Sequence, residues 1–226
     1  MAYHNNPRIV TDGLVLCLDA NAKRSYPGTG STWYNLVDST YDFTNSGATY
    51  NSAGYFDFDG TNDKMTSSIV QYSTTDDWTH EVVLDPGSSG IATSWNGIFG
   101  SGLYQGGYWF FHSGQLAFYQ TYINPTTYLW YTGLDLGTDI PYDTITHLAM
   151  THDGAGGLKV FVTGVQQRST TFTFGGSYSA GIDQVGSGDG SRYGTSNIYL
   201  FRHYNRLLSS TELLQNYEAH KSRFGL

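Results

Sequence analysis

The sequence predicts an all-β fold: a two-sheet antiparallel sandwich of jelly-roll type with one C-terminal helix. Charged residues make up only 13% of the chain, about half the usual share of roughly 25%. Gly, Ser, Thr and Tyr, which suit strands and tight turns, take their place. Short segments that alternate apolar and polar residues recur along the chain, with turn residues between them. Helix signals gather only near the C-terminus.

At 226 residues the chain is short enough to fold as a single domain. We expect an N-terminal arm over residues 1–9, the sandwich over 10–208, and a helix over 209–226 that packs on the same domain. The arm has no apolar periodicity, and ordering it costs about 1–2 kcal/mol of entropy per residue. We therefore expect a neighbouring subunit to hold it.

The first half of the chain alternates strands with loops. Residues 14–19 are almost all apolar, which indicates a strand buried on both faces. We expect residues 20–54 to be mostly loop because turn signals recur in them. Residues 55–59 alternate Phe with Tyr or Asp, the pattern of a half-buried strand. A further strand over 79–84 should end at the Asp-Pro-Gly segment 85–87.

The second half contains the aromatic centre of the chain and a clear hairpin signal. Gly, Ser, Asn and Pro divide residues 97–131 into short aromatic strands. Residues 144–152 and 158–162 are predicted to pair as a hairpin around the glycine-rich turn 153–157. Three further strands are expected within 169–206.

The C-terminal segment carries the start and stop signals of a helix. Ser209 and Glu212 have the spacing of a capping box. Lys221 and Arg223 lie where cations favour the helix dipole, and Gly225 suits the end of a helix. These residues predict one helix near 209–222.

Five motifs together resemble the laminin-G-like, concanavalin A-like lectin/glucanase family. They are DGLVLCLDA (12–20), FDFDGTND (56–63), HLAMTHDG (147–154), LKVFVTGV (158–165) and IYLFRHYNRLLS (198–209). The resemblance covers residues 10–224 and implies a sandwich in which the first and last strands pair. Two positions depart from the family pattern: His152 stands where an aromatic residue is usual, and Thr163 where Asn is usual.

The same resemblance guides the functional expectation. Domains of this family recognise surfaces and glycans more often than they catalyse reactions. Stand-alone chains that begin with DGLVL (12–16) and close with a segment like LQNYEAHKSRFG (214–225) resemble structural proteins of tailed bacteriophages. We expect a non-catalytic virion surface or structural protein, either a head decoration or a fibre or tail component, that adheres to glycans. The alternatives are a carbohydrate-binding module for host-surface or environmental polysaccharide, and a glycan-degrading enzyme.

Composition limits the partners. A net charge of −8 with only 11 Lys and Arg repels phosphate backbones, so no nucleic-acid partner is expected. No apolar run approaches the roughly 18 residues that cross a bilayer, and residues 1–8 lack the apolar stretch of a signal peptide. We expect synthesis in the host cytoplasm and a final location in the virion. Expected partners are capsid or tail subunits, further copies of the chain and cell-surface glycans.

Catalytic residues are not expected. Glucanase relatives on this fold carry two carboxylates that flank the scissile bond, as E-x-D-x-E or E-x-D-x-x-E. The chain has only Glu81, Glu212 and Glu218, none of them in such a motif. Asp57 and Asp59 alternate with Phe and should form an outward polar strand face. The single cysteine, Cys17, permits no internal disulfide and is expected to be buried.

Calcium is the one metal that the sequence suggests. The turn that contains Asp59, Asn62 and Asp63 offers the oxygen ligands that calcium prefers. Asp183 and Asp189 are a second candidate pair. The same residues also suit an ordinary tight turn, so both interpretations stay open and no cofactor is certain.

Exposed aromatic side chains are the candidate glycan site, because sugar rings stack on Trp and Tyr faces. Trp33 and Trp95 lie in segments rich in Ser, Thr, Gly and Asn, and Trp130 flanks tyrosines. We expect Trp33, Trp95, Trp130 and Tyr131 to contact a glycan.

Overall fold

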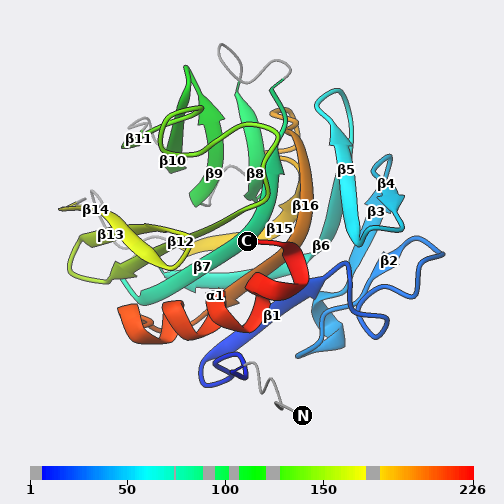
Figure 1. The fold of residues 1–226 in the computed structure, drawn as a ribbon, viewed down its shortest axis with the longest axis horizontal. Coiled ribbons are helices and arrows are strands. Elements are labelled where there is room, and N and C mark those ends of the chain that lie inside the picture. Colours follow the sequence, from blue (N-terminus) through cyan, green and yellow to red (C-terminus); the bar gives the residue numbers. More distant parts are fainter. Residues whose placement is uncertain (1–6, 74, 89–94, 102–106, 121–127, 172–178) are drawn as a thin grey trace.

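A computed structural model gives the structure of the chain and describes residues 7–73, 75–88, 95–101, 107–120, 128–171 and 179–226. These residues form two eight-stranded antiparallel sheets that stack as a sandwich, with one α-helix on the outside (Figure 1). The predicted all-β sandwich with a C-terminal helix is confirmed. No helix among the described residues is long and apolar enough to cross a membrane.

The first sheet runs from an exposed edge strand in the last third of the sequence to a short strand in the first quarter of it. In spatial order its strands are β14 (Val165–Thr171), β13 (Gly157–Val162), β12 (Thr146–Asp153), β7 (Asp77–Pro86), β16 (Thr195–Tyr204), β5 (Tyr55–Asp59) and β4 (Thr49–Asn51), with β1 (Leu14–Asp19) also paired to β16.

The second sheet contains the aromatic centre of the sequence. Its strands, in spatial order, are β11 (Tyr128–Asp135), β10 (Gln115–Gln120), β9 (Gly107–His112), β8 (Asn96–Gly100), β15 (Ser179–Val185), β6 (Lys64–Ser73), β3 (Phe43–Ser46) and β2 (Thr32–Trp33). A 3₁₀ turn, η1 (Ser39–Tyr41), lies between β2 and β3.

The first and last strands pair, as the family resemblance implies. β1 runs antiparallel to the second half of β16, with Leu18 opposite Phe201, while the first half of β16 pairs with β5. α1 (Ser210–Phe224) follows directly and has the predicted capping box between Ser209 and Glu212. Gly225 ends the helix in the left-handed conformation, at φ 73°.

The N-terminal segment is held by the domain itself. The Arg8 carbonyl accepts a hydrogen bond of 2.6 Å from the Gln215 side chain of α1. The Val10 N–H donates to Asn216 Oδ1 at 2.8 Å, and the Val10 carbonyl accepts from the Tyr204 hydroxyl at 3.1 Å. Arg8 and Val10 thus contact α1 and β16 of the same chain. The expectation that a neighbouring subunit holds the arm stays an untested prediction, and residues 1–6 lie outside the described residues.

Both faces of the centre of the first sheet are covered, which explains why β7 and β16 are buried along most of their length with little alternation. Phe58, Val82 and Leu84 point between the sheets and join the main core. On the opposite face, Leu213 of α1 packs in a second cluster with Tyr204 and other residues of this sheet. β5, which lies beyond the helix, keeps the predicted alternation of buried and exposed residues.

Residues 20–54 are mostly loop, as predicted, although they also supply the short strands β2, β3 and β4. One prediction about this segment is wrong. Trp33 is not an exposed glycan contact, because it has 0% exposure. β2 pairs with β3 at the sheet edge and turns the indole inward, where it packs against Phe56 with ring centroids 4.8 Å apart.

Candidate functional site

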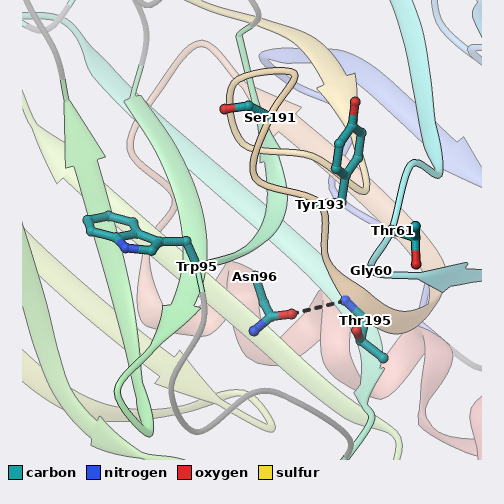
Figure 2. A pocket seen from close by; sticks show the side chains of 7 residues that line it. All are labelled: Gly60, Thr61, Trp95, Asn96, Ser191, Tyr193 and Thr195. Atoms are coloured by element: carbon teal, nitrogen blue, oxygen red, sulfur yellow. Dashed lines mark hydrogen bonds between the residues drawn. The ribbon is translucent and has the colours of Figure 1, made fainter.

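A pocket of about 390 Å³ opens where three connections of the sandwich meet (Figure 2). They are the β5–β6 turn, the residues at the start of β8, and the loop between β15 and β16. The pocket lining combines two aromatic rings with hydroxyl and amide groups. It consists of Gly60, Thr61, Trp95, Asn96, Ser191, Tyr193 and Thr195.

The β5–β6 turn is fixed by its own carboxylates. Asp59 Oδ1 accepts a hydrogen bond from the Thr61 N–H at 2.7 Å, and Asp63 Oδ2 accepts from the Asp59 N–H at 3.1 Å. Gly60 adopts φ +77°, and a Cβ at this residue would collide with the Thr195 hydroxyl. Only glycine therefore brings this turn against the start of β16.

The residues proposed as calcium ligands can also be explained by their place in the β5–β6 turn. Burial raises the pKa of the Asp63 carboxyl, and the negative charges of Asp59 and Asp57 raise it further. Asn62 is exposed. Among the described residues, no group of three or more His, Cys, Asp or Glu side chains is arranged to hold a metal. The hydrogen bonds of Asp59 and Asp63 thus account for the fold of the turn, and calcium binding there stays an untested prediction.

The β15–β16 loop is built around a buried carboxylate. Asp189 is 3% exposed, and its Oδ1 accepts hydrogen bonds from the Ser191 N–H at 3.1 Å, the Ser191 hydroxyl at 2.8 Å and the Arg192 N–H at 3.1 Å. Asp189 Oδ2 forms an ion pair with the Arg192 guanidinium. These contacts fold the loop tightly and fix the direction of the Arg192 side chain.

Glycines let this loop lie directly on β8. A Cβ at Gly97 would fall on the backbone of Gly188 and Arg192, and one at Gly194 would fall on the Gly97 carbonyl. The loop is also tied to β8 by the hydrogen bond from the Gly186 N–H to the Ile98 carbonyl, 2.8 Å long. The backbone approach leaves no space for side chains between the two segments.

Trp95 lies in a stack of side chains at one wall of the pocket. Phe110 is nearly parallel to the indole, with ring centroids 4.8 Å apart and an interplanar angle of 25°. The Arg192 guanidinium lies over the indole, 4.6 Å from its centroid, and the His112 ring is 4.3 Å away. Burial, followed by the charge of Arg192, lowers the pKa of His112.

Tyr193 and the polar residues form the rest of the pocket. Tyr193 is half-buried, and its backbone pairs with Ser187 across the base of the loop. The Lys64 ammonium lies 5.9 Å from the Tyr193 ring centroid. Asn96 Oδ1 accepts a hydrogen bond from the Thr195 N–H at 3.3 Å, drawn in Figure 2.

The glutamates of the chain lie away from this pocket. Glu81 is fully buried and contacts His147, Arg202 and Asn216 beneath α1. Glu212 and Glu218 belong to α1 itself. None of the described lining residues carries a carboxylic acid side chain. The groups that they present can form hydrogen bonds and stack against other rings.

The structure unites some of the predicted site residues and separates others. Trp95 and the turn that begins at Asp59 belong to the same pocket. Trp33 lies in the core. Trp130 and Tyr131 belong to β11, but their side chains lie outside the part of the chain that the structure describes. Asp189 folds the pocket loop through Ser191 and Arg192.

Sequence reasoning missed the other half of the pocket. Ser191, Tyr193 and Thr195 follow a Gly-Ser-rich stretch, residues 186–190, whose composition is typical of β-turns. An aromatic residue directly after such a stretch was the available signal, because loop aromatics among small residues often face solvent. Asn96 carried no signal of its own.

A family profile described as the concanavalin A-like lectin/glucanases superfamily matches residues 58–214. No curated protein sequence matches the chain. Among solved structures, the botulinum neurotoxin serotype D binding domain aligns with a TM-score of 0.64 at 12% identity, over 92% of this chain and 52% of that one. The serotype D ligand binding domain in complex with N-acetylneuraminic acid aligns at 0.65 and 13%, over 92% and 51%.

A sialidase from Trypanosoma rangeli aligns with a TM-score of 0.63 at 17% identity, over 95% of this chain and 34% of that one. The chain thus spans about half the length of the neurotoxin domains. At these identities the likeness shows the lectin-like fold. The family match, which covers more than half of the sequence, shows that the chain belongs to the concanavalin A-like lectin/glucanases superfamily.

Proposed function

We propose that the chain is a non-catalytic, glycan-recognising protein of a tailed-bacteriophage virion, and that the pocket between the β5–β6 turn, β8 and the β15–β16 loop binds the sugar. The observation that carries glycan recognition is the lining of this pocket. It combines aromatic side chains, which suit the C–H faces of a sugar, with hydroxyl and amide groups for the sugar hydroxyls.

The charge of the pocket favours a neutral sugar. Arg192 is neutralised by the buried Asp189, and Asp59 lies in the turn on the opposite side. The whole chain is acidic, with a net charge of −8. An anionic polysaccharide would therefore meet only the single Lys64 ammonium beside Tyr193, and recognition through stacking and hydrogen bonds should depend little on salt.

The virion role is supported by the sequence. The opening segment DGLVL (12–16) and the closing segment 214–225 resemble those of phage structural proteins. One pocket of this size gives weak binding, so adhesion needs many copies on one particle, which a virion surface supplies. Capsid or tail subunits would then be partners of the chain. Mass spectrometry of purified particles tests this role: the chain should be a stoichiometric component, and its absence from particles would contradict the assignment.

A glycan array tests the pocket. The wild-type protein, displayed in many copies on a bead, should bind a set of neutral glycans. Thr61→Arg places a long side chain over the pocket and should abolish the signal. Thr211→Arg is the matched control, because Thr211 is exposed on α1, beyond the opposite end of β16. Equal binding by both variants would contradict the pocket assignment, and binding by neither would point to a charge effect.

Absence of catalysis is tested on the same glycans. The pocket has no carboxylate pair, so incubation with the glycans that bind should release no reducing ends. Measurable release that Thr61→Arg removes would identify the pocket as an enzyme site and overturn the non-catalytic assignment.

A further inference from the structure

We propose that Tyr193, and not Trp95, is the ring on which the sugar stacks, while Trp95 belongs to a closed stack that forms the pocket wall. This inference rests on the proposed glycan-binding function and specifies how the pocket would carry it out. From the sequence alone, Trp95 is the better candidate for the ring that stacks on the sugar, because its large ring lies among small polar residues. The contacts around the two rings instead favour Tyr193.

The positions that a sugar would need on Trp95 are occupied by the protein. A guanidinium lies over the indole at 4.6 Å, and the Phe110 ring stacks on it at 4.8 Å. The tilted His112 ring is closer still, at 4.3 Å. A pyranose needs a comparable distance from a ring face, so it must displace one of these groups.

Moving the Arg192 guanidinium away from Trp95 costs free energy, because the guanidinium is paired with the Asp189 carboxylate. The Asp189 side chain is fully buried, whereas the Arg192 side chain keeps 28% exposure. Removing the guanidinium would leave a buried negative charge without its counter-charge, which is a strongly unfavourable state. The neighbouring N–H groups that hold Asp189 in place also stop it from following Arg192 outward. The Asp189–Arg192–Trp95 stack is therefore a fixed wall.

Tyr193 is partly exposed, and no aromatic ring of the described residues stacks on it. Its hydroxyl makes no hydrogen bond within the described part of the chain, in contrast to Tyr204, whose hydroxyl is bonded in the core. Figure 2 shows Tyr193 between Ser191 and Thr61, with the Trp95 indole directed away from them on the far side of Asn96. Sugar stacked on Tyr193 would thus reach hydroxyl and amide groups.

The cation beside Tyr193 is easily moved. The Lys64 ammonium lies 5.9 Å from the ring centroid, close to the roughly 6 Å limit of a cation–π contact. Lys64 makes no ion pair in the described residues, and its flexible stem allows the ammonium to swing away without exposing a buried charge. A neutral pyranose that offers a C–H face to Tyr193 and hydroxyls to Thr61 and Ser191 fits this arrangement.

Affinity measurements with a glycan selected on the array test the proposal, using isothermal titration calorimetry on purified variants. Tyr193→Ala should weaken binding about tenfold, which corresponds to loss of a stacked ring. Tyr193→Phe keeps the ring and should stay within about threefold of wild type. Trp95→Phe keeps a ring in the wall and should also stay within about threefold. Thermal unfolding of each variant checks that the fold is intact.

The outcomes separate this inference from the proposed function. If Tyr193→Ala binds as tightly as wild type while Trp95→Phe loses affinity, the sugar stacks on Trp95 and the inference is overturned, although glycan binding stands. If the wild-type protein binds no glycan on the array, the proposed function fails and this inference fails with it. Tenfold loss in Tyr193→Ala together with retention in both Phe variants supports the assignment of Tyr193.

Discussion

At the scale of single residues, Glu81 illustrates how burial decides the role of a carboxylate. Its Oε1 lies 3.2 Å from His147 Nε2. Its Oε2 accepts from Asn216 at 2.8 Å and from Arg202 at 3.4 Å. Burial pushes the pKa of Glu81 upward, but the hydrogen bond from His147 and the charge of Arg202 outweigh it and hold the pKa below its usual value. Glu81 is therefore a buried anion that joins β7, β12, β16 and α1.

Glu81→Gln should lower the free energy of unfolding by about 3–5 kcal/mol, because it leaves the Arg202 guanidinium buried without a counter-charge. Urea unfolding measures the effect. Glu218→Gln is the matched control: Glu218 is partly exposed and pairs only with Lys221, so its loss should change stability by less than about 1 kcal/mol. Equal stability of the two variants would show that the buried network does not hold the helix.

The sequence predicts the environment of a side chain less well than its chemistry. Trp33 and Trp95 lie in similar Ser- and Thr-rich surroundings, yet one is in the core and the other lines a pocket. The difference arises because β2 pairs with β3 and directs Trp33 inward. That pairing joins segments separated by a loop, and local composition contains no information about it. The hydroxyls around Tyr193 escaped prediction for the same reason.

At the scale of elements, local signals were sufficient where one segment determines its own structure. Alternation predicted β5, and the capping box predicted the start of α1. The hairpin of β12 and β13 formed around its glycine turn, and Thr163 adopts φ 50° in the next turn, where the family pattern has Asn. The pocket could not be predicted in this way, because it is made by three connections that meet only after the sheets have stacked.

The packing of the β15–β16 loop on β8 supplies a prediction at this scale. Gly97→Ala should lower the free energy of unfolding by about 1–3 kcal/mol and weaken glycan binding, because the new methyl group collides with the backbone of Gly188 and Arg192. Gly87→Ala is the control: its Cβ would lie 3.5 Å from the Thr195 methyl group, an ordinary contact. Full glycan affinity in Gly97→Ala would show that the loop position does not set the pocket.

At the scale of the whole molecule, the sandwich buries histidines as neutral groups. His80 and His203 lie between the sheets, with ring centroids 5.0 Å apart. Burial, followed by the charges of His203 and His152, lowers the pKa of His80 well below its usual value. Burial lowers the pKa of His203 to about 3. His220, beneath α1, has its pKa lowered to about 2 by burial and by Arg202.

These histidines make the stability of the domain depend on pH. In the unfolded chain they take up protons near pH 6.5. In the folded protein His203 stays neutral down to about pH 3 and His220 down to about pH 2, and the pKa of His80 is also well below 6.5. Stability is therefore complete above pH 6.5 and is lost as the pH falls, by up to about 1.4 kcal/mol per pH unit for each histidine. Carboxylates contribute to this loss of stability only at lower pH. The Arg206 hydrogen bond lowers the pKa of Glu212 to about 2, so the stability that this hydrogen bond supplies is lost as the pH falls below about 4.5.

Urea unfolding at pH 8, 7, 6 and 5 measures this dependence. The free energy of unfolding should be constant between pH 8 and 7 and should fall steeply between pH 6 and 5, where ordinary carboxylates are still ionised. His203→Phe, which keeps an aromatic ring beside Tyr72 and His80, should reduce the slope by about one proton. The same free energy at pH 7 and pH 5 would mean that the folded domain accepts protons on these rings, which would require the space between the sheets to admit water and charge.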